Sequence, residues 1–424
     1  MMSIFPVIVF IPRFYASDVG VPLAVVGSYI FITRVLDVFT DPLMGYLSDR
    51  TRSRFGRRRP WVALATPIMM LSIYKLFMPP ADADGLYMFV WMVALSVATT
   101  MMLIPYYAWG AELSTDYNER SKVTGWRASA GVVGQLTAQL VPALALFFFG
   151  LGGSATVLEL VGIAMLVTMP LCVTLTLAKT PEAQHSGTSV VPLLPGLKLM
   201  FTNGPFLRLV AAFMIGSIGL NITTPLYIFF VADVLGAEDR SIYMLSCFYL
   251  TNLLTIPFWV WLSGQIGKHR AYLLSFIIIA CAHPFYLLLG EGDFWWMLPV
   301  TIVTGFAAAG FSQAIPNSMK ADVIDLDTLE SGENRAALFF SAWSFAQKAT
   351  ASIGGAIAMF GLALWGFDAT PDAVNSEQQM WGLRFLFSTF PSIFFLTAAV
   401  IVWKYPITPE RHAEIQSAIA AKGQ

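Results

Sequence analysis

The chain has 424 residues, of which 57% are hydrophobic and only 12% are charged, and its mean hydropathy is +0.67. A soluble protein carries roughly 25% charged residues, so this composition excludes an ordinary water-soluble protein and indicates a membrane protein. The formal net charge of -1 also excludes the broadly basic surface that binding to nucleic acid requires.

Apolar runs separated by short polar turns predict an all-α fold of about twelve membrane-spanning helices. We place them at about residues 1–16, 22–48, 60–79, 85–113, 121–150, 157–178, 206–233, 240–266, 271–290, 294–320, 336–366 and 382–404. A polar stretch that contains PEAQHSGT separates the sixth helix from the seventh. The predicted domains are an N-terminal six-helix bundle at 1–178, a central cytoplasmic loop at 179–205, a C-terminal six-helix bundle at 206–404 and a cytoplasmic tail at 405–424.

The two predicted bundles resemble each other in sequence. LSDRTRSRFGRRR at 47–59 has a weaker echo in LSGQIGKHR at 262–270. IPYYAWGAELSTD at 104–116 is echoed by IPNSMKADVID at 315–325. A parallel repeat of two bundles, with substrate bound between them, is the architecture of the major facilitator transporters. We therefore expect the major facilitator fold.

The basic residues indicate the orientation, because cytoplasmic loops are enriched in Lys and Arg. The loops on the opposite side carry only Arg240 and Arg384 as basic residues and are otherwise acidic. This asymmetry predicts a multi-pass protein of the plasma membrane, in a bacterium the inner membrane, with both termini in the cytoplasm. The basic residues of the cytoplasmic side include Arg50, Arg52, Arg54, Arg57, Arg58, Arg59, Arg120, Lys122, Lys268, Arg270, Lys320 and Arg335.

The second predicted helix carries three ionisable residues, Arg34, Asp37 and Asp41. Their spacings of three and four place them on one helical face. Each charge inside a membrane costs several kcal/mol unless it is paired or faces a water-filled path. Arg34 could simply neutralise one of the acids within the bundle, or the carboxylates could form a site for sodium or a proton.

Two further basic residues lie deep in predicted helices. Lys348 is about 18 Å from the cytoplasmic end of the eleventh helix, where it needs a carboxylate, and Asp37 or Asp41 of the other half could supply one. Such a pair could be structural or could act as a gate. Arg127, in the fifth helix, and Arg34 are candidates for contact with a hydroxylated or anionic substrate, although Arg127 also fits a role at the cytoplasmic rim.

The loop after the second helix, SDRTRSRFGRRRP, contains Asp49, Arg50, Gly56 and Arg57. Its basic residues are an orientation signal. Because Gly56 permits a tight turn and the arginines can pair with acids of neighbouring helices, we also predict a conformational latch.

Three aromatic residues, Tyr106, Tyr107 and Trp343, lie next to other candidate site residues in the sequence. A sugar ring could stack on one of them, although most aromatic residues in such a chain face lipid or the membrane interface. His283 is interpreted as a hydrogen-bonded core residue and not as a proton relay.

The motif RVLDVFTDPLMGYLSDRTRSRFGRRRPW resembles that of the glycoside-pentoside-hexuronide:cation symporters, the major facilitator branch that includes melibiose permease. The resemblance continues through IPYYAWGAELSTDYNERSKVTGWR, MKADVIDLDTLESGENR and FFSAWSFAQKATASIGGA, so it covers both halves.

The resemblance implies roles for individual residues. Asp37 and Asp41 match the acids that bind the coupling cation in that family, and Thr100 matches a threonine that assists them. Lys348 matches a lysine that takes part in coupling. Arg127 matches an arginine at the sugar pocket, and Tyr107 stands at the position of a sugar-stacking aromatic residue.

Two acids that grip galactoside hydroxyls in melibiose permease are absent, because their positions fall at Leu103 and near Met2. We therefore expect a twelve-helix secondary transporter that symports a sugar, glycoside or sugar acid, but not melibiose in the same manner. A carrier of an amphiphilic or lipid-like solute is one alternative, which Leu103 would suit, and a non-transporting membrane receptor on the same fold is another.

An enzyme is not expected, since the sequence has no HExxH motif and no nucleophile beside a base. The predicted coupling ion is sodium or a proton, and we expect no cofactor and no metal beyond a sodium ion at Asp37 and Asp41. The expected partners are a sugar-like small-molecule substrate and the lipid bilayer. We also expect a monomer that binds no nucleic acid.

The predicted orientation can be tested by labelling single cysteines with an impermeant thiol reagent in sealed cells. Cysteines at residues 82–84 or 371–377 should react from outside, because these loops are predicted to face outward. Cysteines at positions 53 and 185 should stay unlabelled. Labelling of position 185 from outside would contradict the division into two six-helix halves.

Overall fold

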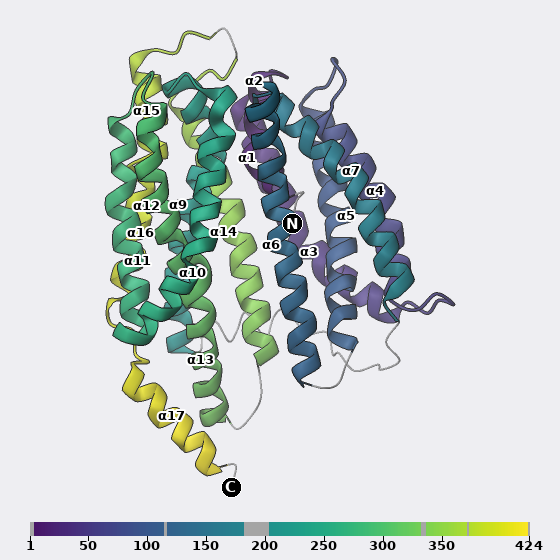
Figure 1. Ribbon diagram of the computed structural model, residues 1–424, viewed down its shortest axis with the longest axis vertical. Helices are drawn as coiled ribbons and strands as arrows, with labels where there is room; N and C mark the ends of the chain where they lie inside the picture. Colours follow the sequence, from purple (N-terminus) through teal and green to yellow (C-terminus); the bar gives the residue numbers. More distant parts are fainter. Residues whose placement is uncertain (1–3, 114–116, 182–202, 332–335, 371–372, 423–424) are drawn as a thin grey trace. The chain divides into compact units, whose positions relative to one another are not determined.

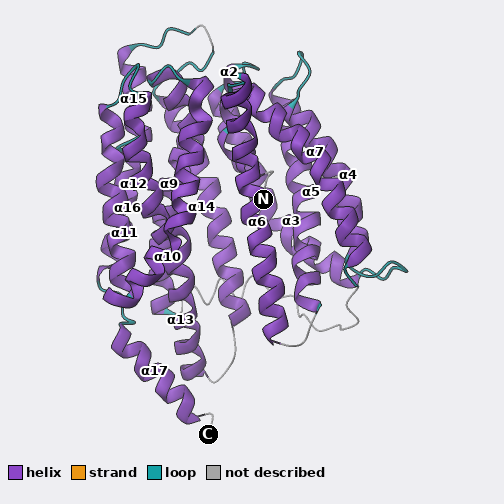
Figure 2. Ribbon diagram, in the orientation of Figure 1, coloured by secondary structure: helices purple, strands orange, loops and turns teal. Residues whose placement is uncertain are grey.

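The computed structural model describes residues 4–113, 117–181, 203–331, 336–370 and 373–422, and the regular structure in these ranges is entirely helical (Figure 2). The prediction of an all-α protein is confirmed. The chain divides into two compact units. Unit 1 consists of residues 1–190, 238–242 and 368–374, and unit 2 consists of residues 191–237, 243–367 and 375–424.

Unit 1, within its described residues, is built from two short helices and five long ones, and the long helices lie side by side (Figure 1). Its main helices are α1 (Ile4–Val9), α2 (Ile11–Ser17), α3 (Leu23–Arg50), α4 (Arg59–Phe77), α5 (Gly85–Glu112), α6 (Tyr117–Phe149) and α7 (Ser154–Lys179). Helix α5 packs against both α3 and α4, and α4 also contacts α7. The start of α5 is fixed by Asp84, whose carboxylate accepts a hydrogen bond from the Tyr87 backbone N–H and so caps the helix.

Unit 2 is centred on α9 (Gly204–Phe229), which contacts the helices named α14 and α16 most extensively. The remaining elements are η1 (Phe230–Val234), α10 (Ser241–Ile266), α11 (Lys268–Ala282), η3 (His283–Leu288), η4 (Phe294–Trp296), α12 (Met297–Ala309), η5 (Gly310–Ala314), α13 (Ile315–Ser331), α14 (Ala336–Leu364), α15 (Glu377–Phe387), α16 (Phe390–Trp403) and α17 (Pro409–Lys422). Short π-helical turns, η1 and η5, extend α9 and join α12 to α13. Turns of this kind occur mostly inside longer helices, often near functional sites.

Every predicted span overlaps helix, and three spans differ most from the prediction. The first span is divided at Phe10. The tenth continues through η5 and α13 to Ser331, so Lys320 lies inside a helix and not in a loop. The last begins at Glu377, where Ser376 and Gln379 form a capping box. Hydropathy detects only the apolar part of a helix, whereas the tenth and last helices each continue through further polar turns.

Length and apolar composition suit the membrane for nine of the helices within the described ranges. Three further predicted spans correspond to the short pair α1 and α2, to α6 and to α14. In lipid, helices associate through close packing and not through the hydrophobic effect, so small residues at contact points are especially important.

Glycines allow the helices around α9 to approach closely. A Cβ atom at Gly354 of α14 would lie 2.5 Å from Cβ of Asn221 and 2.9 Å from its carbonyl carbon. A Cβ atom at Gly219 of α9 would lie 3.1 Å from the carbonyl oxygen of Pro391 in α16. The backbones of α14 and α16 thus lie against α9 at positions where only glycine fits without movement.

We expect Gly354→Ala to lower the stability of the purified protein by about 1–3 kcal/mol, because the added methyl group forces α14 away from α9. Gly264→Ala in α10 is the matched control, since no atom lies within 4 Å of the added Cβ. Thermal unfolding in detergent measures both variants. Equal unfolding temperatures for the two variants would show that the α9–α14 contact does not depend on the glycine.

Candidate functional site: the acidic face of α3 and a polar pocket in unit 2

Two acids of α3 are each hydrogen-bonded to a hydroxyl group of α5. The Ser96 hydroxyl donates to Asp37 Oδ1, and the Thr100 hydroxyl donates to Asp41 Oδ1 at 2.9 Å. The partners in both pairs are 59 residues apart in the sequence. Because each pair is one helical turn from the other on both helices, α3 and α5 advance together and form two successive polar rungs.

Each rung has one buried residue within unit 1. Asp37 of the first rung is 4% exposed, and Thr100 of the second rung is 7% exposed, while Ser96 and Asp41 are partly buried. Arg34 Nη1 donates to the other carboxylate oxygen of Asp37 at 3.3 Å. Arg34 therefore supplies positive charge to the carboxylate, as the structural interpretation of the sequence expected, and its role in substrate contact stays a prediction.

The chemistry of this face suits a hard cation. Carboxylate and hydroxyl oxygens are the ligands that such cations prefer. Each hydroxyl uses its hydrogen to bind a carboxylate and keeps lone pairs that could face a cation. Asp37, Asp41, Ser96 and Thr100 thus bring oxygen atoms of four side chains to the contact between α3 and α5.

Sequence reasoning identified Asp37, Asp41 and Thr100 but missed Ser96. The signal was present, because Ser96 precedes Thr100 by four residues just as Asp37 precedes Asp41. Two helices with polar residues at the same spacing can pair those residues in register. A serine in an apolar helix usually bonds to its own backbone, so the pairing needs the structure to become visible.

Arg127 and Tyr107, both predicted from sequence to contact substrate, lie together in unit 1. The guanidinium carbon of Arg127 is 4.6 Å from the centroid of the Tyr107 ring. Tyr107 is 39% exposed. The pair therefore presents a positive charge next to an accessible aromatic ring, a combination that can bind a polar ring or an acidic group.

The other two predicted site residues belong to unit 2. Trp343 is only 4% exposed and packs against Phe213, with ring centroids 4.3 Å apart. This burial makes it a core residue in the described structure and not an open stacking surface. Lys348 is partly buried in α14, and its pairing with Asp37 or Asp41 stays a prediction.

The predicted latch loop is organised by an arginine other than those selected from the sequence. Asp49 pairs with Arg58, at 2.5 Å between Oδ1 and Nη2. Arg58 also donates to the Ser48 hydroxyl at 2.7 Å and is 1% exposed. Gly56 has φ of 100°, which confirms that the turn uses the conformational freedom of glycine.

The neighbouring arginine Arg50 is placed differently from Arg58. Its guanidinium carbon lies 4.2 Å from the centroid of the Tyr46 ring, on the same helix. Arg57 also makes contacts, and its part in a latch stays a prediction. The basic run thus contains one buried structural arginine, which charge counting could not distinguish from its neighbours.

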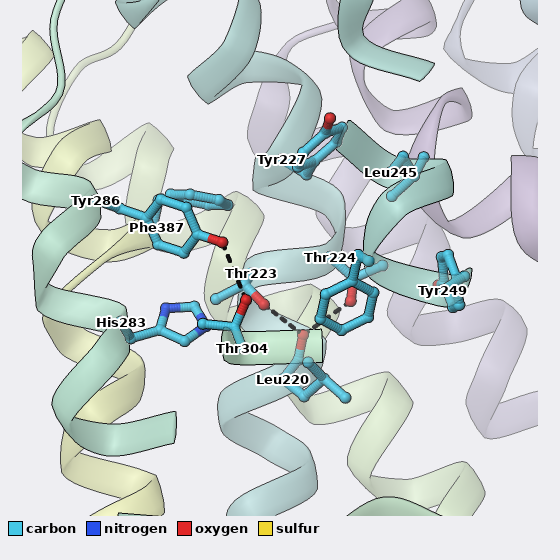
Figure 3. A pocket seen from close by; sticks show the side chains of 11 residues that line it. Leu220, Thr223, Thr224, Tyr227, Leu245, Tyr249, His283, Tyr286, Thr304 and Phe387 are labelled. Carbon is cyan, nitrogen blue, oxygen red and sulfur yellow. Dashed lines mark hydrogen bonds between the residues drawn. The ribbon is translucent and has the colours of Figure 1, made fainter. Parts of the chain in front are cut away.

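A separate pocket of about 60 Å³ lies within unit 2 (Figure 3). Hydroxyl groups and aromatic rings line it, together with His283, and the lining contains no carboxylate, lysine or arginine. The Tyr286 hydroxyl lies 3.1 Å from the Thr304 hydroxyl, and the hydroxyls of Thr223 and Thr224 both donate to the Leu220 carbonyl at 2.8 Å. The volume suits ordered water or a small hydroxyl-bearing group.

His283 is buried beside this pocket, as the sequence interpretation expected, with 4% exposure. Its Nδ1 atom, however, has no hydrogen-bond partner among the described residues. The backbone of Phe387 and Ser388 nevertheless forms hydrogen bonds with the ring, as expected for a hydrogen-bonded core histidine. Aromatic neighbours complete its surroundings, since the Tyr286 and Phe395 rings lie 5.3 and 5.5 Å away.

Comparison with known proteins defines the family. The family model described as MFS/sugar transport protein matches residues 1–409. The chain belongs to this family of major facilitator transporters. It is thus a multi-pass membrane transporter of a small molecule and not an enzyme.

Two relatives match this transporter over most of its length. An uncharacterized symporter of Synechocystis sp. is 26% identical, covering 99% of this chain and 94% of the relative. The sodium-dependent lysophosphatidylcholine symporter 1 of Gallus gallus is also 26% identical, covering 92% of this chain and 81% of the relative. A crystal structure of the nucleoside transporter NupG has a TM-score of 0.64 at 15% identity, covering 95% of this chain and 97% of that one, which supports the fold alone.

The second rung of the transporter can be tested with two neighbouring threonines. We expect Thr100→Val to destabilise the protein by about 1–3 kcal/mol, because the valine leaves an Asp41 oxygen without its hydroxyl donor. Thr99→Val is the matched control, since the Thr99 hydroxyl bonds only within its own helix, to the Leu95 carbonyl. Thermal unfolding compares the two, and equal losses would mean that the α3–α5 hydrogen bond adds nothing.

Proposed function

We propose that this transporter couples the movement of a sugar or sugar acid to a cation that binds at Asp37 and Asp41. The observation that carries the proposal is the pair of rungs between α3 and α5, which gathers carboxylate and hydroxyl oxygens inside a membrane-spanning bundle. A scaffold has no need to bury these charges, because each one costs several kcal/mol. The same argument disfavours a non-transporting receptor.

The contact between Arg127 and Tyr107 supports a sugar-like solute. An aromatic ring can stack on the apolar face of a sugar, while a guanidinium can bind a hydroxyl or a carboxylate. The pattern of residues resembling the glycoside-pentoside-hexuronide symporters points to the same class. Leu103 stands where a galactoside-binding acid would be, so the solute differs from melibiose in its contacts.

A lysolipid is the second candidate solute. It is favoured by Leu103, which replaces a polar contact by an apolar one, and by the similarity to the sodium-dependent lysophosphatidylcholine symporter 1 of Gallus gallus. A single acyl chain would need an apolar surface of considerable length, whereas a sugar needs closely spaced polar groups. The two candidates therefore make opposite demands on the same site.

For the coupling ion, sodium is favoured over a proton. The acids of both rungs and the Thr100 hydroxyl provide the hard oxygen ligands that sodium requires. The relative from Gallus gallus is sodium-dependent by name. Leu103 removes one further carboxylate, which weakens the case for sodium and leaves proton coupling as the alternative outcome.

The proposal includes the expected orientation and the coupling role of Lys348. The basic loops support an orientation with both termini in the cytoplasm, in a bacterial inner membrane, and the protein would act as a monomer of two six-helix domains. Lys348, partly buried in α14, would alternate with the cation as the partner of Asp37 and Asp41 on α3.

Uptake by proteoliposomes tests the proposal with glucose, glucuronate and lysophosphatidylcholine as solutes, each with a sodium or a proton gradient. Asp37→Asn should reduce gradient-driven accumulation by about tenfold or more, because the coupling cation loses a charged ligand, while counterflow continues. Lys348→Ala should impair accumulation less completely.

The control variant for this experiment is Asp84→Asn. Asp84 caps α5 from outside the helix, and asparagine caps equally well, so accumulation should be unchanged. Full accumulation by the Asp37→Asn protein would show that the acids of α3 are structural and that the cation binds elsewhere.

A further inference from the structure

Lys320 is a buried cation that, among the described residues, contacts aromatic rings and an amide and forms no ion pair. The residue is 4% exposed in α13. Its Nζ atom lies 4.4 Å from the Phe340 ring centroid and 4.8 Å from the Trp343 ring centroid. The ammonium also donates one hydrogen bond, to Asn317 Oδ1 at 3.2 Å. No described carboxylate lies within the 4 Å distance of an ion pair with this ammonium.

Two acids that follow Lys320 on α13, Asp322 and Asp325, contact other basic side chains. Asp322 accepts hydrogen bonds from Lys268 at 2.6 and 2.8 Å, and His412 Nε2 lies 3.2 Å from the same carboxylate. Asp325 lies 3.8 Å from His412. Asp322 and Asp325 are therefore directed toward Lys268 and the tail helix α17, and not toward Lys320.

This arrangement leaves the positive charge of Lys320 only partly compensated. An ammonium has three N–H donors, of which the described structure uses one. Contacts with aromatic faces contribute about 0.5–2 kcal/mol each, less than the cost of several kcal/mol for removing the charge from water. A methionine would fill the same space without that cost, so burial alone does not explain a lysine here.

The groups around the ammonium are fixed on one side and accessible on the other. Trp343 is held from behind by Phe213, whose ring centroid is 4.3 Å away. Phe340 is 55% exposed, and Asn317, which donates from Nδ2 to the Gln313 carbonyl at 2.8 Å, is also exposed. An acidic group could therefore reach the ammonium past Phe340 and Asn317, while the buried Trp343 ring closes the opposite side.

We propose that Lys320, with Asn317 and the rings of Phe340 and Trp343, forms a binding site for the acidic group of the transported solute. The ammonium would donate its remaining hydrogens to a carboxylate or phosphate oxygen, and the Asn317 amide would add a neutral contact. This inference rests on the proposed function and deepens it, since it selects acidic solutes over neutral ones of the same shape. The acidic group is the carboxylate of a sugar acid or the phosphate of a lysolipid.

Equilibrium binding to the purified full-length protein tests this site with two matched pairs of probes. Glucuronate is compared with glucose, and lysophosphatidylcholine is compared with a monoacylglycerol of the same chain length. Lys320→Met should weaken binding of the acidic member of the recognised pair by about tenfold or more, because a charged hydrogen bond is lost. Binding of the neutral member should change by less than about threefold, and Lys320→Arg should retain most of the affinity for the acid.

The control variant is Lys404→Met, which removes an exposed lysine of the same unit and should leave all affinities unchanged. Thermal unfolding without probe separates a binding role from a structural one. If Lys320 serves the solute, Lys320→Met should unfold at the same or a higher temperature than the natural protein, because a buried charge has been removed. If the lysine is a structural anchor for the rings, the variant should unfold at a lower temperature.

The pair of probes that binds identifies the source of the acidic group. Equal affinity of the natural protein for acidic and neutral members, unchanged affinity in Lys320→Met, or failure of both acidic probes to bind would each overturn the proposal. These outcomes are distinct from a failure of the proposed function, which would appear as absence of gradient-driven accumulation even when the acidic probe binds through Lys320.

Discussion

Placing charge inside a membrane-spanning bundle is the constraint on which the rest of this structure depends. Each buried carboxylate requires a cation or several donors, because lipid provides neither. Asp37 meets this requirement with Arg34 on its own helix and with Ser96 on α5. The acid is therefore compensated on one side by charge and on the other by a group that can also face a cation. A site built in this way can exist before the ion binds and still gain from binding it.

The helix packing follows from the same absence of water. In unit 1 the polar rungs themselves connect α3 to α5, and Thr100 places its hydroxyl 2.9 Å from Asp41. In unit 2 the central contacts depend on shape, since Gly354 and Gly219 let α14 and α16 lie against α9. Directional hydrogen bonds set the register of two helices, whereas glycine contacts set their separation. The α3–α5 contact and the contacts of α9 are thus held by different means.

The sequence predicted the helices from hydropathy and singled out Asp37 and Asp41 as acids within an apolar run, and it pointed to Thr100 through the resemblance to the glycoside-pentoside-hexuronide symporters. It did not predict Ser96, since a serine in an apolar helix usually binds its own backbone. It ended the tenth helix at Lys320, where the apolar run ends, whereas α13 continues as helix to Ser331. It also could not select Arg58 from a run of arginines, as only burial separates that residue from its neighbours. These errors share one cause: polar side chains within helices reveal their partners only when neighbouring helices are placed.

The charges of the proposed cation and anion sites affect how far the membrane potential can drive transport. Moving one elementary charge across a membrane potential of 100 mV changes the free energy by about 2.3 kcal/mol. A cation carried with a neutral sugar would move one net charge, so the membrane potential would add to the driving force. The same cation carried with a monoanionic solute would form a neutral pair, and the concentration gradients alone would drive it. A cation site at Asp37 and an anion site at Lys320 would therefore make transport of a sugar acid independent of the potential. Lysophosphatidylcholine carries no net charge, because its choline cation balances its phosphate, so its transport with one cation would still respond to the potential. The net charge of the solute would thus decide the source of its driving force.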